Sequence, residues 1–326
     1  MLAKIKHFCA FWLRVTRAYA LGMTIMSWGV VFIWGIFDKG NILLGLLCLI
    51  GLLFAHLGTN LLDDYLDFKK NTEIVKNLKE KCWFLKSNAL TLHQTLLAIC
   101  TLFFIASIIG LYLTIKIGPI VAIIATFSAI LCLFYTKATY IGLGEVIIGL
   151  LFSPCLYLGT YYVMTKSFSL PLMLISISTA LLTIGVLHTH TMMDFECDKQ
   201  DKKITLSHLL KTSKNAFLGL NLIIFGAFFN IILLIIFKIL PPVFLLVFLS
   251  LPIAIQLYKI MKTWLYSPTQ TLNANFWMGP MEALSDDIQL KNFMIRFYTS
   301  RNLMMIFAIF LCIAKAFDSN IFGTIK

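Results

Sequence analysis

The stretch ILLGLLCLIGLLFAHLGTNLLDDYLDFKKNT, residues 42–72, places a long apolar run directly before a group of acidic residues. A helix of about 20 apolar residues crosses the hydrocarbon core of a membrane, and the run from 42 onward approaches that length. Asn60, Asp63, Asp64 and Asp67 follow at its end. A carboxylate at the bilayer centre costs about 3 kcal/mol, so an acidic group at the edge of an apolar segment indicates a function.

The composition of the whole chain agrees with a membrane protein. Of its 326 residues, 60% are hydrophobic and 13% are charged, whereas soluble domains carry about 25% charged residues. The net charge of +12 could suggest nucleic acid, but the basic residues lie between apolar runs instead of on a soluble face. We therefore expect a single integral membrane domain over residues 1–326, all-α, with no nucleic-acid partner.

Nine apolar segments are long enough to span the membrane. They lie near residues 18–37, 42–62, 92–115, 118–135, 143–164, 170–190, 217–238, 240–259 and 302–320. With the N-terminus inside, the inner segments hold 21 Lys and Arg residues and the outer segments hold 6. Basic residues favour the cytoplasmic side, so this asymmetry predicts a multi-pass protein with a cytoplasmic N-terminus.

A second acidic cluster follows the sixth span, in HTHTMMDFECDKQDKKITL (188–206). Asp194, Asp198 and Asp201 repeat the i, i+4, i+7 spacing of Asn60, Asp64 and Asp67, and such positions share one face of a helix. Both clusters end on the same side of the membrane. The sequence thus predicts nine helices around a central cavity that opens to the cytoplasm, with the two clusters facing each other across it.

Each cluster taken alone could be a solvated cap at a helix end. Taken together they favour a Mg²⁺ site, because hard cations prefer oxygen ligands and Mg²⁺ commonly shares the phosphates of a substrate. Two acidic sets, Mg²⁺ and inward-pointing lysines suit a diphosphate headgroup whose hydrocarbon tail lies in the bilayer.

These motifs resemble those of the UbiA superfamily of intramembrane prenyltransferases, and most closely those of the 1,4-dihydroxy-2-naphthoate prenyltransferases of menaquinone synthesis. The family motif N-x-x-x-D-Y-x-D is matched at residues 60–67. The second motif, D-x-x-x-D followed by a basic residue, x and T-L, is matched at residues 194–206. The segment around Gly142, Leu143, Gly144 and Glu145 is also similar to that family.

The resemblance implies a nine-helix fold in the inner membrane of a bacterium and a role for each matched residue. Four aspartates would hold Mg²⁺ against a polyprenyl diphosphate and thereby serve catalysis: Asp64, Asp67, Asp194 and Asp198. Asn60, Lys137 and Lys203 would bind the diphosphate. An aromatic acceptor would then attack the allylic cation, with membrane lipid surrounding the prenyl chain.

The chain departs from this pattern before the second motif, where menaquinone-type members usually have NNLRD and this chain has HTMMD (190–194). We expect His190 to lie on the cavity face, where an imidazole can bind or deprotonate a phenolic hydroxyl. An alternative is that His190 orients Asp194 through a hydrogen bond. The departure leaves open other acceptors: a hydroxybenzoate, a homogentisate-like ring or a porphyrin.

A function of another class is a cation-coupled secondary transporter, because intramembrane carboxylates also carry protons and cations. Transporters tend to place such groups near the bilayer midplane, on broken helices within inverted repeats. Both clusters here lie at one end of their spans, and no repeat is evident in the sequence. We therefore rank transport below prenyl transfer.

Overall fold

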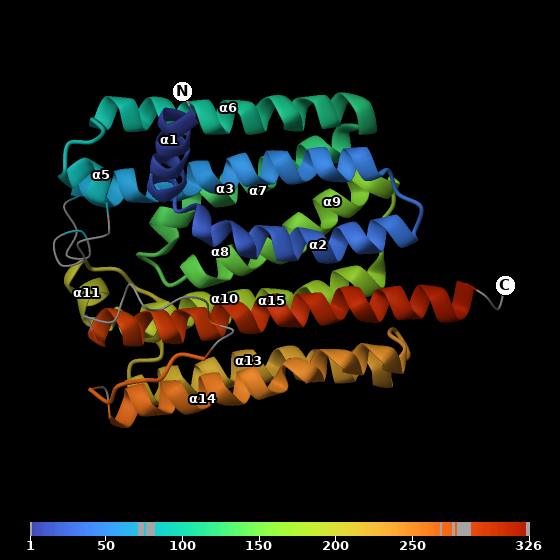
Figure 1. The fold of residues 1–326 in the computed structure, drawn as a ribbon. Coiled ribbons are helices and arrows are strands. Elements are labelled where there is room, and N and C mark those ends of the chain that lie inside the picture. The colour runs from blue at the N-terminus through green and yellow to red at the C-terminus, as the bar shows by residue number, and fades with distance from the viewer. Residues whose placement is uncertain are drawn as a thin grey trace.

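The computed structural model describes residues 2–70, 75, 82–267, 269–275, 278 and 288–323. Within these residues the chain is helical, and nine helices are long and apolar enough to cross a membrane. The long helices lie side by side in one bundle (Figure 1). The fold class predicted from the sequence, an all-α membrane protein with nine spans, is confirmed for the described part of the chain.

The spans follow the predicted order. They are formed by η1 (Ala18–Ala20) with α2 (Leu21–Phe37), α3 (Ile42–Lys70), α6 (Leu92–Ile117), α7 (Pro119–Ala138), α8 (Gly144–Leu150) with the π-helical η2 (Leu151–Cys155) and α9 (Leu156–Thr165), α10 (Leu170–Met193), α13 (Ser213–Ile236), η3 (Pro242–Ser250) with α14 (Leu251–Tyr266), and α15 (Ile288–Gly323). Four short helices lie between or before them: α1 (Leu2–Val15), α5 (Trp83–Lys86), α11 (Phe195–Gln200) and α12 (Leu206–Leu209).

Two predicted boundaries were wrong. The last span was expected at 302–320, but α15 begins at Ile288. Polar side chains in the part of α15 before residue 302 have partners: Asn292 bonds the backbone of Gln270 and Leu272, and Arg301 lies 4.4 Å from the ring centroid of Tyr298. The second span was expected to end near 62, but α3 continues to Lys70. The first acidic motif therefore lies on the continuing helix that its i, i+4, i+7 spacing predicts.

A tight turn at Gly118–Pro119 connects two of the spans. Gly118 ends α6 with φ +135°, and Pro119 begins α7. A positive φ costs glycine little, and proline fits the first position of a helix, where no N–H partner is needed. This pair therefore reverses the chain within one peptide unit.

The bundle packs mainly through apolar contacts, with a few polar bonds between helices. Trp34 of α2 meets Phe244 of η3, and Phe228 of α13 meets Phe307 of α15. Asn230 of α13 donates to the carbonyl oxygen of Leu174 in α10. Such bonds hold helices together where water cannot compete. The outer surface of the bundle carries large exposed apolar side chains, as a lipid-facing surface requires.

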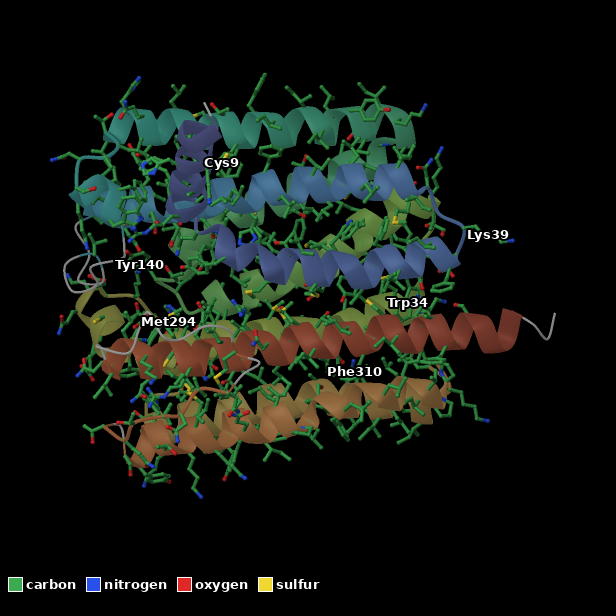
Figure 2. All side chains as sticks on the ribbon, viewed as in Figure 1. Cys9, Trp34, Lys39, Tyr140, Met294 and Phe310 are labelled. Carbon is green, nitrogen blue, oxygen red and sulfur yellow. The ribbon has the colours of Figure 1, made fainter. Side chains whose placement is uncertain are left out.

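Helix α1 differs from the spans because it lies across α3 and α6 instead of parallel to them (Figure 1). Its residues Phe11 and Trp12 pack with Val15 against Leu61 of α3 and Ile99 of α6. Figure 2 places Lys39 at one end of the bundle and Tyr140 and Met294 at the other. The C-terminal ends of α3 and α10 share the Tyr140 end (Figure 1), so the two acidic motifs lie at the same end, as the sequence predicts.

Candidate functional site

The first motif lies on the last three turns of α3. Asp64 and Asp67 are 3% and 2% exposed, while Asp63 beside them remains half-buried. The spacing of Asn60, Asp64 and Asp67 places all three on the same side of the helix. The Asn60 amide donates to the carbonyl oxygen of Thr16 at 3.2 Å, so this residue also anchors the turn between α1 and α2.

That turn supplies a cation that the sequence analysis did not single out. Arg17 has left-handed backbone angles, φ 53° and ψ 44°, and its guanidinium returns toward α3. Its Nη2 lies 3.1 Å from Asp63 Oδ2 and 3.4 Å from Asp64 Oδ1, and it donates to the Asn60 carbonyl oxygen at 2.9 Å. Asp64 and Asp63 raise the pKa of Arg17 against the effect of burial, so it stays charged.

The second motif lies where α10 gives way to α11. Asp194 and Asp198 are 9% and 4% exposed, and the Asp198 N–H bonds the Asp194 carbonyl oxygen at 2.9 Å. Glu196, between these two aspartates in the sequence, is exposed. The four aspartates expected to bind metal are thus all buried at the end of the bundle.

His190 lies one turn before Asp194, with Nδ1 3.0 Å from Asp194 Oδ2. Its ring is edge-on to Phe293 of α15, with centroids 5.1 Å apart. This geometry corresponds to the alternative in which His190 orients Asp194. His188 points elsewhere, as the helical spacing predicts: it is buried, and its Nε2 lies 2.9 Å from the Ala216 carbonyl oxygen.

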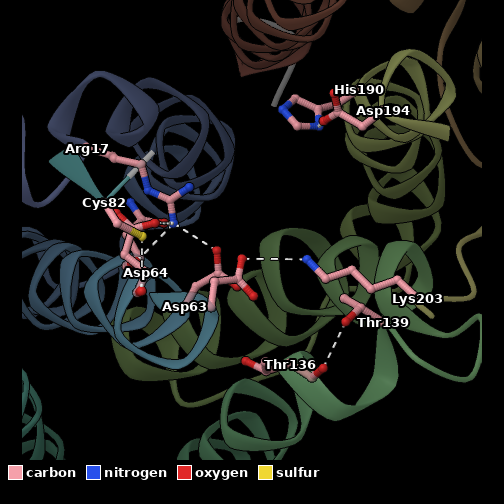
Figure 3. Close-up of polar contacts among 11 residues, drawn as sticks. Arg17, Asp63, Asp64, Cys82, Thr136, Thr139, His190, Asp194 and Lys203 are labelled. Atoms are coloured by element: carbon pink, nitrogen blue, oxygen red, sulfur yellow. Dashed lines mark hydrogen bonds and ion pairs between the residues drawn. The ribbon is translucent and has the colours of Figure 1, made fainter. Parts of the chain in front are cut away.

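Lys203 brings the two motifs together. Its Nζ lies 3.5 Å from Asp67 Oδ2, while its own N–H bonds the Asp198 carbonyl oxygen at 2.8 Å. Figure 3 shows Arg17, Asp63 and Asp64 on one side, His190 and Asp194 on the other, and the Lys203 side chain extending toward the α3 carboxylates. One lysine therefore contacts the first motif with its side chain and the second with its backbone.

Lys203 is held in place by a buried network. The Ile204 N–H donates to the Thr139 carbonyl oxygen at 2.9 Å. The Leu206 N–H and the Thr191 hydroxyl both donate to Glu145 Oε1, at 3.0 and 3.1 Å. Glu145 is 1% exposed. This carboxylate fixes the segment after Lys203 to both α8 and α10.

The turn before α8 also needs a specific residue. Gly142 has φ +80°, and a Cβ atom there would lie 2.5 Å from the Leu209 Cδ1 atom of α12. Only glycine meets both conditions without strain. The GLGE segment (142–145) thus has a structural role in positioning the second motif.

Lys137, which was expected to bind the diphosphate, lies apart from the residues of the two acidic motifs. It lies in the last turn of α7 with an exposed side chain. No contact ties it to the acidic residues within the described part of the chain. Of the two lysines proposed from the sequence, the structure therefore brings only Lys203 to the carboxylates.

Acidic side chains outnumber permanent cations among the described residues of the site. The cations there are Arg17 and Lys203, and the acidic residues are Asp63, Asp64, Asp67, Asp194 and Asp198. Burial raises the pKa of Asp198 to about 7, although Lys203 lowers it. Buried carboxylates in excess are costly unless a cation compensates them.

Mg²⁺ fits this donor set. No three His, Cys, Asp or Glu side chains of the described residues lie close enough to enclose an ion. The carboxylates instead form two pairs, one on each motif. Mg²⁺ typically takes one or two carboxylates and completes its shell with water and substrate phosphate, so each pair suits an ion that is shared with a diphosphate.

Comparisons with known proteins agree with this arrangement. No curated protein sequence matches the chain. Among solved structures, one titled as concerning digeranylgeranylglyceryl phosphate synthase in membranes has 16% identity and a TM-score of 0.61, and covers 93% of this chain and 97% of its own. The apo structure of a UbiA homologue from Aeropyrum pernix K1 has 13% identity and a TM-score of 0.58, and covers 90% and 97%.

At these identities the two structures support the fold alone. The sequence model of the UbiA prenyltransferase family matches residues 17–279 of the chain. This range contains Arg17, both acidic motifs and the Glu145 network. The chain is a multi-pass membrane enzyme that belongs to the UbiA prenyltransferase family.

Proposed function

We propose that this prenyltransferase moves a polyprenyl group from its diphosphate onto an aromatic acceptor in a Mg²⁺-dependent reaction, with 1,4-dihydroxy-2-naphthoate of menaquinone synthesis as the leading acceptor. The observation that carries the proposal is the 3.5 Å ion pair between Lys203 and Asp67. It joins two buried acidic pairs at one end of the bundle, as a site for one diphosphate requires.

The diphosphate would lie between the motifs. Asp64 and Asp67 from α3, and Asp194 and Asp198 from the α10–α11 junction, would hold Mg²⁺ there, and bound Mg²⁺ would neutralise charge that develops on the leaving pyrophosphate. Arg17 and Lys203 would exchange their carboxylate partners for phosphate oxygens, because charge-assisted bonds to phosphate are strong.

These residues act as electrostatic stabilisers of the leaving group. The bond between the allylic carbon and the diphosphate oxygen breaks, and the acceptor ring attacks that carbon. Asn60 contributes indirectly, since its amide holds the Thr16 carbonyl oxygen and its own carbonyl accepts from Arg17.

The direction in the membrane belongs to the same proposal. The distribution of Lys and Arg supports a cytoplasmic location, in a bacterial inner membrane, for the acidic end and the N-terminus. A cysteine placed in the α12 region and labelled with an impermeant reagent would test this in closed vesicles. Labelling from the outside of right-side-out vesicles would contradict it.

The experiment for the function uses the full chain in membranes, radiolabelled farnesyl diphosphate and a panel of acceptors, with products identified by mass. The panel contains 1,4-dihydroxy-2-naphthoate, 4-hydroxybenzoate, homogentisate, a porphyrin and a glyceryl phosphate lipid. We expect a prenylated aromatic product that requires Mg²⁺ and disappears with EDTA.

Asp64→Asn and Asp198→Asn are the matched variants, because each keeps the size of the side chain and removes its charge. Each should lower product formation by a factor of about 100 or more, as expected for loss of a group that stabilises the departing charge. Transfer that persists at the parental rate in both variants would refute the proposed site. Gradient-coupled uptake without transfer would favour the transporter alternative.

A further inference from the structure

His56 lies on α3 one turn before Asn60 and eight residues before Asp64. At 1.5 Å per residue it is about 12 Å from Asp64 along the axis, deeper in the bundle. Positions 56, 60, 63 and 67 follow the helical repeat, so His56 shares the face that carries the acidic motif. An ionisable side chain within a membrane span is costly, and such residues usually serve a function.

The surroundings of His56 place it inside the bundle. Its Nδ1 lies 2.6 Å from the hydroxyl of Thr24 in α2, a residue that is 3% exposed. Its ring is edge-on to Phe152, with centroids 5.1 Å apart and an interplanar angle of 84°. Contacts with α2 on one side and η2 on the other direct the ring away from lipid.

The segment that faces His56 is itself irregular. Phe152 belongs to the π-helical turn Leu151–Cys155, which contains Pro154. Single π-helical turns occur frequently at functional sites. The next residue, Ser153, is fully buried, and its hydroxyl has no hydrogen-bond partner among the residues that the structure describes. An unsatisfied buried hydroxyl costs free energy unless a ligand or water completes its bonding.

The second nitrogen of His56 is available for chemistry. Nδ1 is engaged by Thr24, and Nε2 has no bond to any residue that the structure describes. His56 is half-buried, so part of its ring remains accessible within the bundle. When the Thr24 oxygen accepts from Nδ1–H, the tautomer is fixed and Nε2 presents a lone pair.

We propose that His56 is a catalytic residue that binds the hydroxyl group of the acceptor through Nε2 and takes its proton during prenyl transfer. This inference rests on the proposed function and deepens it. The acceptor must approach the allylic carbon from the side opposite the diphosphate, hence from deeper in the bundle than the acidic motifs. His56 lies at that depth, on the same face of α3.

The step balances without any further reactant. The bond between the allylic carbon and oxygen breaks, and its electron pair leaves with pyrophosphate. A ring carbon of the acceptor forms the new bond to the allylic carbon, while the hydroxyl proton passes to the neutral imidazole. The ring then recovers its hydroxyl by tautomerisation, and the imidazolium releases one proton to water.

His190 is less suited to this role, because its Nδ1 is paired with Asp194 and its ring packs against Phe293. The two histidines thus have separate places: His190 at the carboxylates, where it positions Asp194, and His56 one to two turns behind the first motif.

The test compares His56→Asn with Thr24→Val in the full chain, in detergent, with labelled farnesyl diphosphate. The acceptor is the first of the panel that the parent protein prenylates, with 1,4-dihydroxy-2-naphthoate tried first. Asn can keep the bond to Thr24 but cannot act as a base. A general base contributes about 10²- to 10⁴-fold, so His56→Asn should lower kcat by about 100-fold or more.

The KM for farnesyl diphosphate should stay within threefold of the parent value, because His56 does not contact the diphosphate. Thr24→Val removes only the orienting bond and should lower kcat by about tenfold. In His56→Ala, added imidazole should restore transfer at least tenfold, which a packing defect would not do.

A His56→Asn variant with kcat within threefold of the parent would overturn the inference. The inference would also be overturned if His56→Asn raised the KM for farnesyl diphosphate by the same factor by which it lowered kcat. Failure of the proposed function is distinguishable, because it would appear as unchanged transfer in Asp64→Asn whatever the His56 variants do.

Discussion

Glu145 offers the sharpest test of how the second motif is held. Its Oε1 accepts from the Leu206 N–H at 3.0 Å and from the Thr191 hydroxyl at 3.1 Å, with 1% of the residue exposed. Glu145→Ala removes the one oxygen that accepts both bonds. The Leu206 N–H loses this partner, while the Thr191 hydroxyl keeps a 3.3 Å bond to the His188 carbonyl oxygen. Glu145→Gln keeps an oxygen that can accept both bonds and serves as the matched control.

The magnitude follows from the two bonds. A hydrogen bond to a charged group contributes about 1.5–3 kcal/mol, so the pair contributes about 3–6 kcal/mol. Other anchors remain in Glu145→Ala, among them the bond from Ile204 N–H to the Thr139 carbonyl oxygen. We assume that about half of this free energy is lost from the state in which the segment after Lys203 is in place. Because 1.4 kcal/mol corresponds to a factor of ten, the population with Lys203 in place then falls by about 10- to 100-fold.

The affinity for the diphosphate falls by the fraction of molecules that are competent to bind it. The measurement is the KM for farnesyl diphosphate in solubilised protein, with thermal unfolding measured in parallel. We expect a rise of 10- to 100-fold for Glu145→Ala and of no more than about fivefold for Glu145→Gln. A folded Glu145→Ala protein with a KM within twofold of the parent would refute the idea that this network positions Lys203.

Two further predictions concern charge at the site. Lys203→Ala should raise the KM for farnesyl diphosphate at least tenfold, because it removes the cation that joins the motifs. Lys137→Ala changes an exposed lysine and should change this KM less than twofold. Equal effects of the two variants in steady-state kinetics would contradict the assignment. Burial raises the pKa of Asp198 to about 7, and Mg²⁺ needs the ionised carboxylate. The Mg²⁺ concentration for half-maximal activity should therefore rise about tenfold when the pH is lowered from 8 to 6. The same Mg²⁺ requirement in titrations at both pH values would contradict this prediction.

The fold was predictable because hydropathy and turn residues specify it directly. Apolar runs of membrane length gave all nine spans within the described residues, and Gly118–Pro119 located the tightest turn. The beginning of α15 was missed because hydropathy counts polar side chains such as Asn292 as exposed. Asn292 is 3% exposed and bonded to the 270–272 segment, so partners from a distant segment decided the boundary.

The site was predictable only in part. Helical spacing correctly placed Asp64 and Asp67 on one buried face and directed His188 away. Arg17 was missed because it precedes the first span by one residue, where a basic side chain is expected for topology alone. Its contact with Asp63 and Asp64 depends on the left-handed backbone conformation of Arg17, which the local sequence does not predict. The four-residue separation of His56 from Asn60, which places both on one helix face, was the sequence signal that could have identified His56.

The opposite end of the bundle explains how the acidic end can exchange partners without losing its shape. Asp38, which follows α2, accepts from the Tyr161 hydroxyl of α9 at 2.7 Å and lies 3.5 Å from Lys315 Nζ of α15. These bonds fix α2 and α15 to each other at the end far from the motifs. Arg17 lies in the turn that leads into α2, and α15 carries the Phe293 ring that packs on His190. With their far ends tied, α2 and α15 can keep their positions while Arg17 and Lys203 exchange carboxylate partners for the phosphate oxygens of the proposed substrate, so that substrate would spend little binding energy on rearranging the bundle.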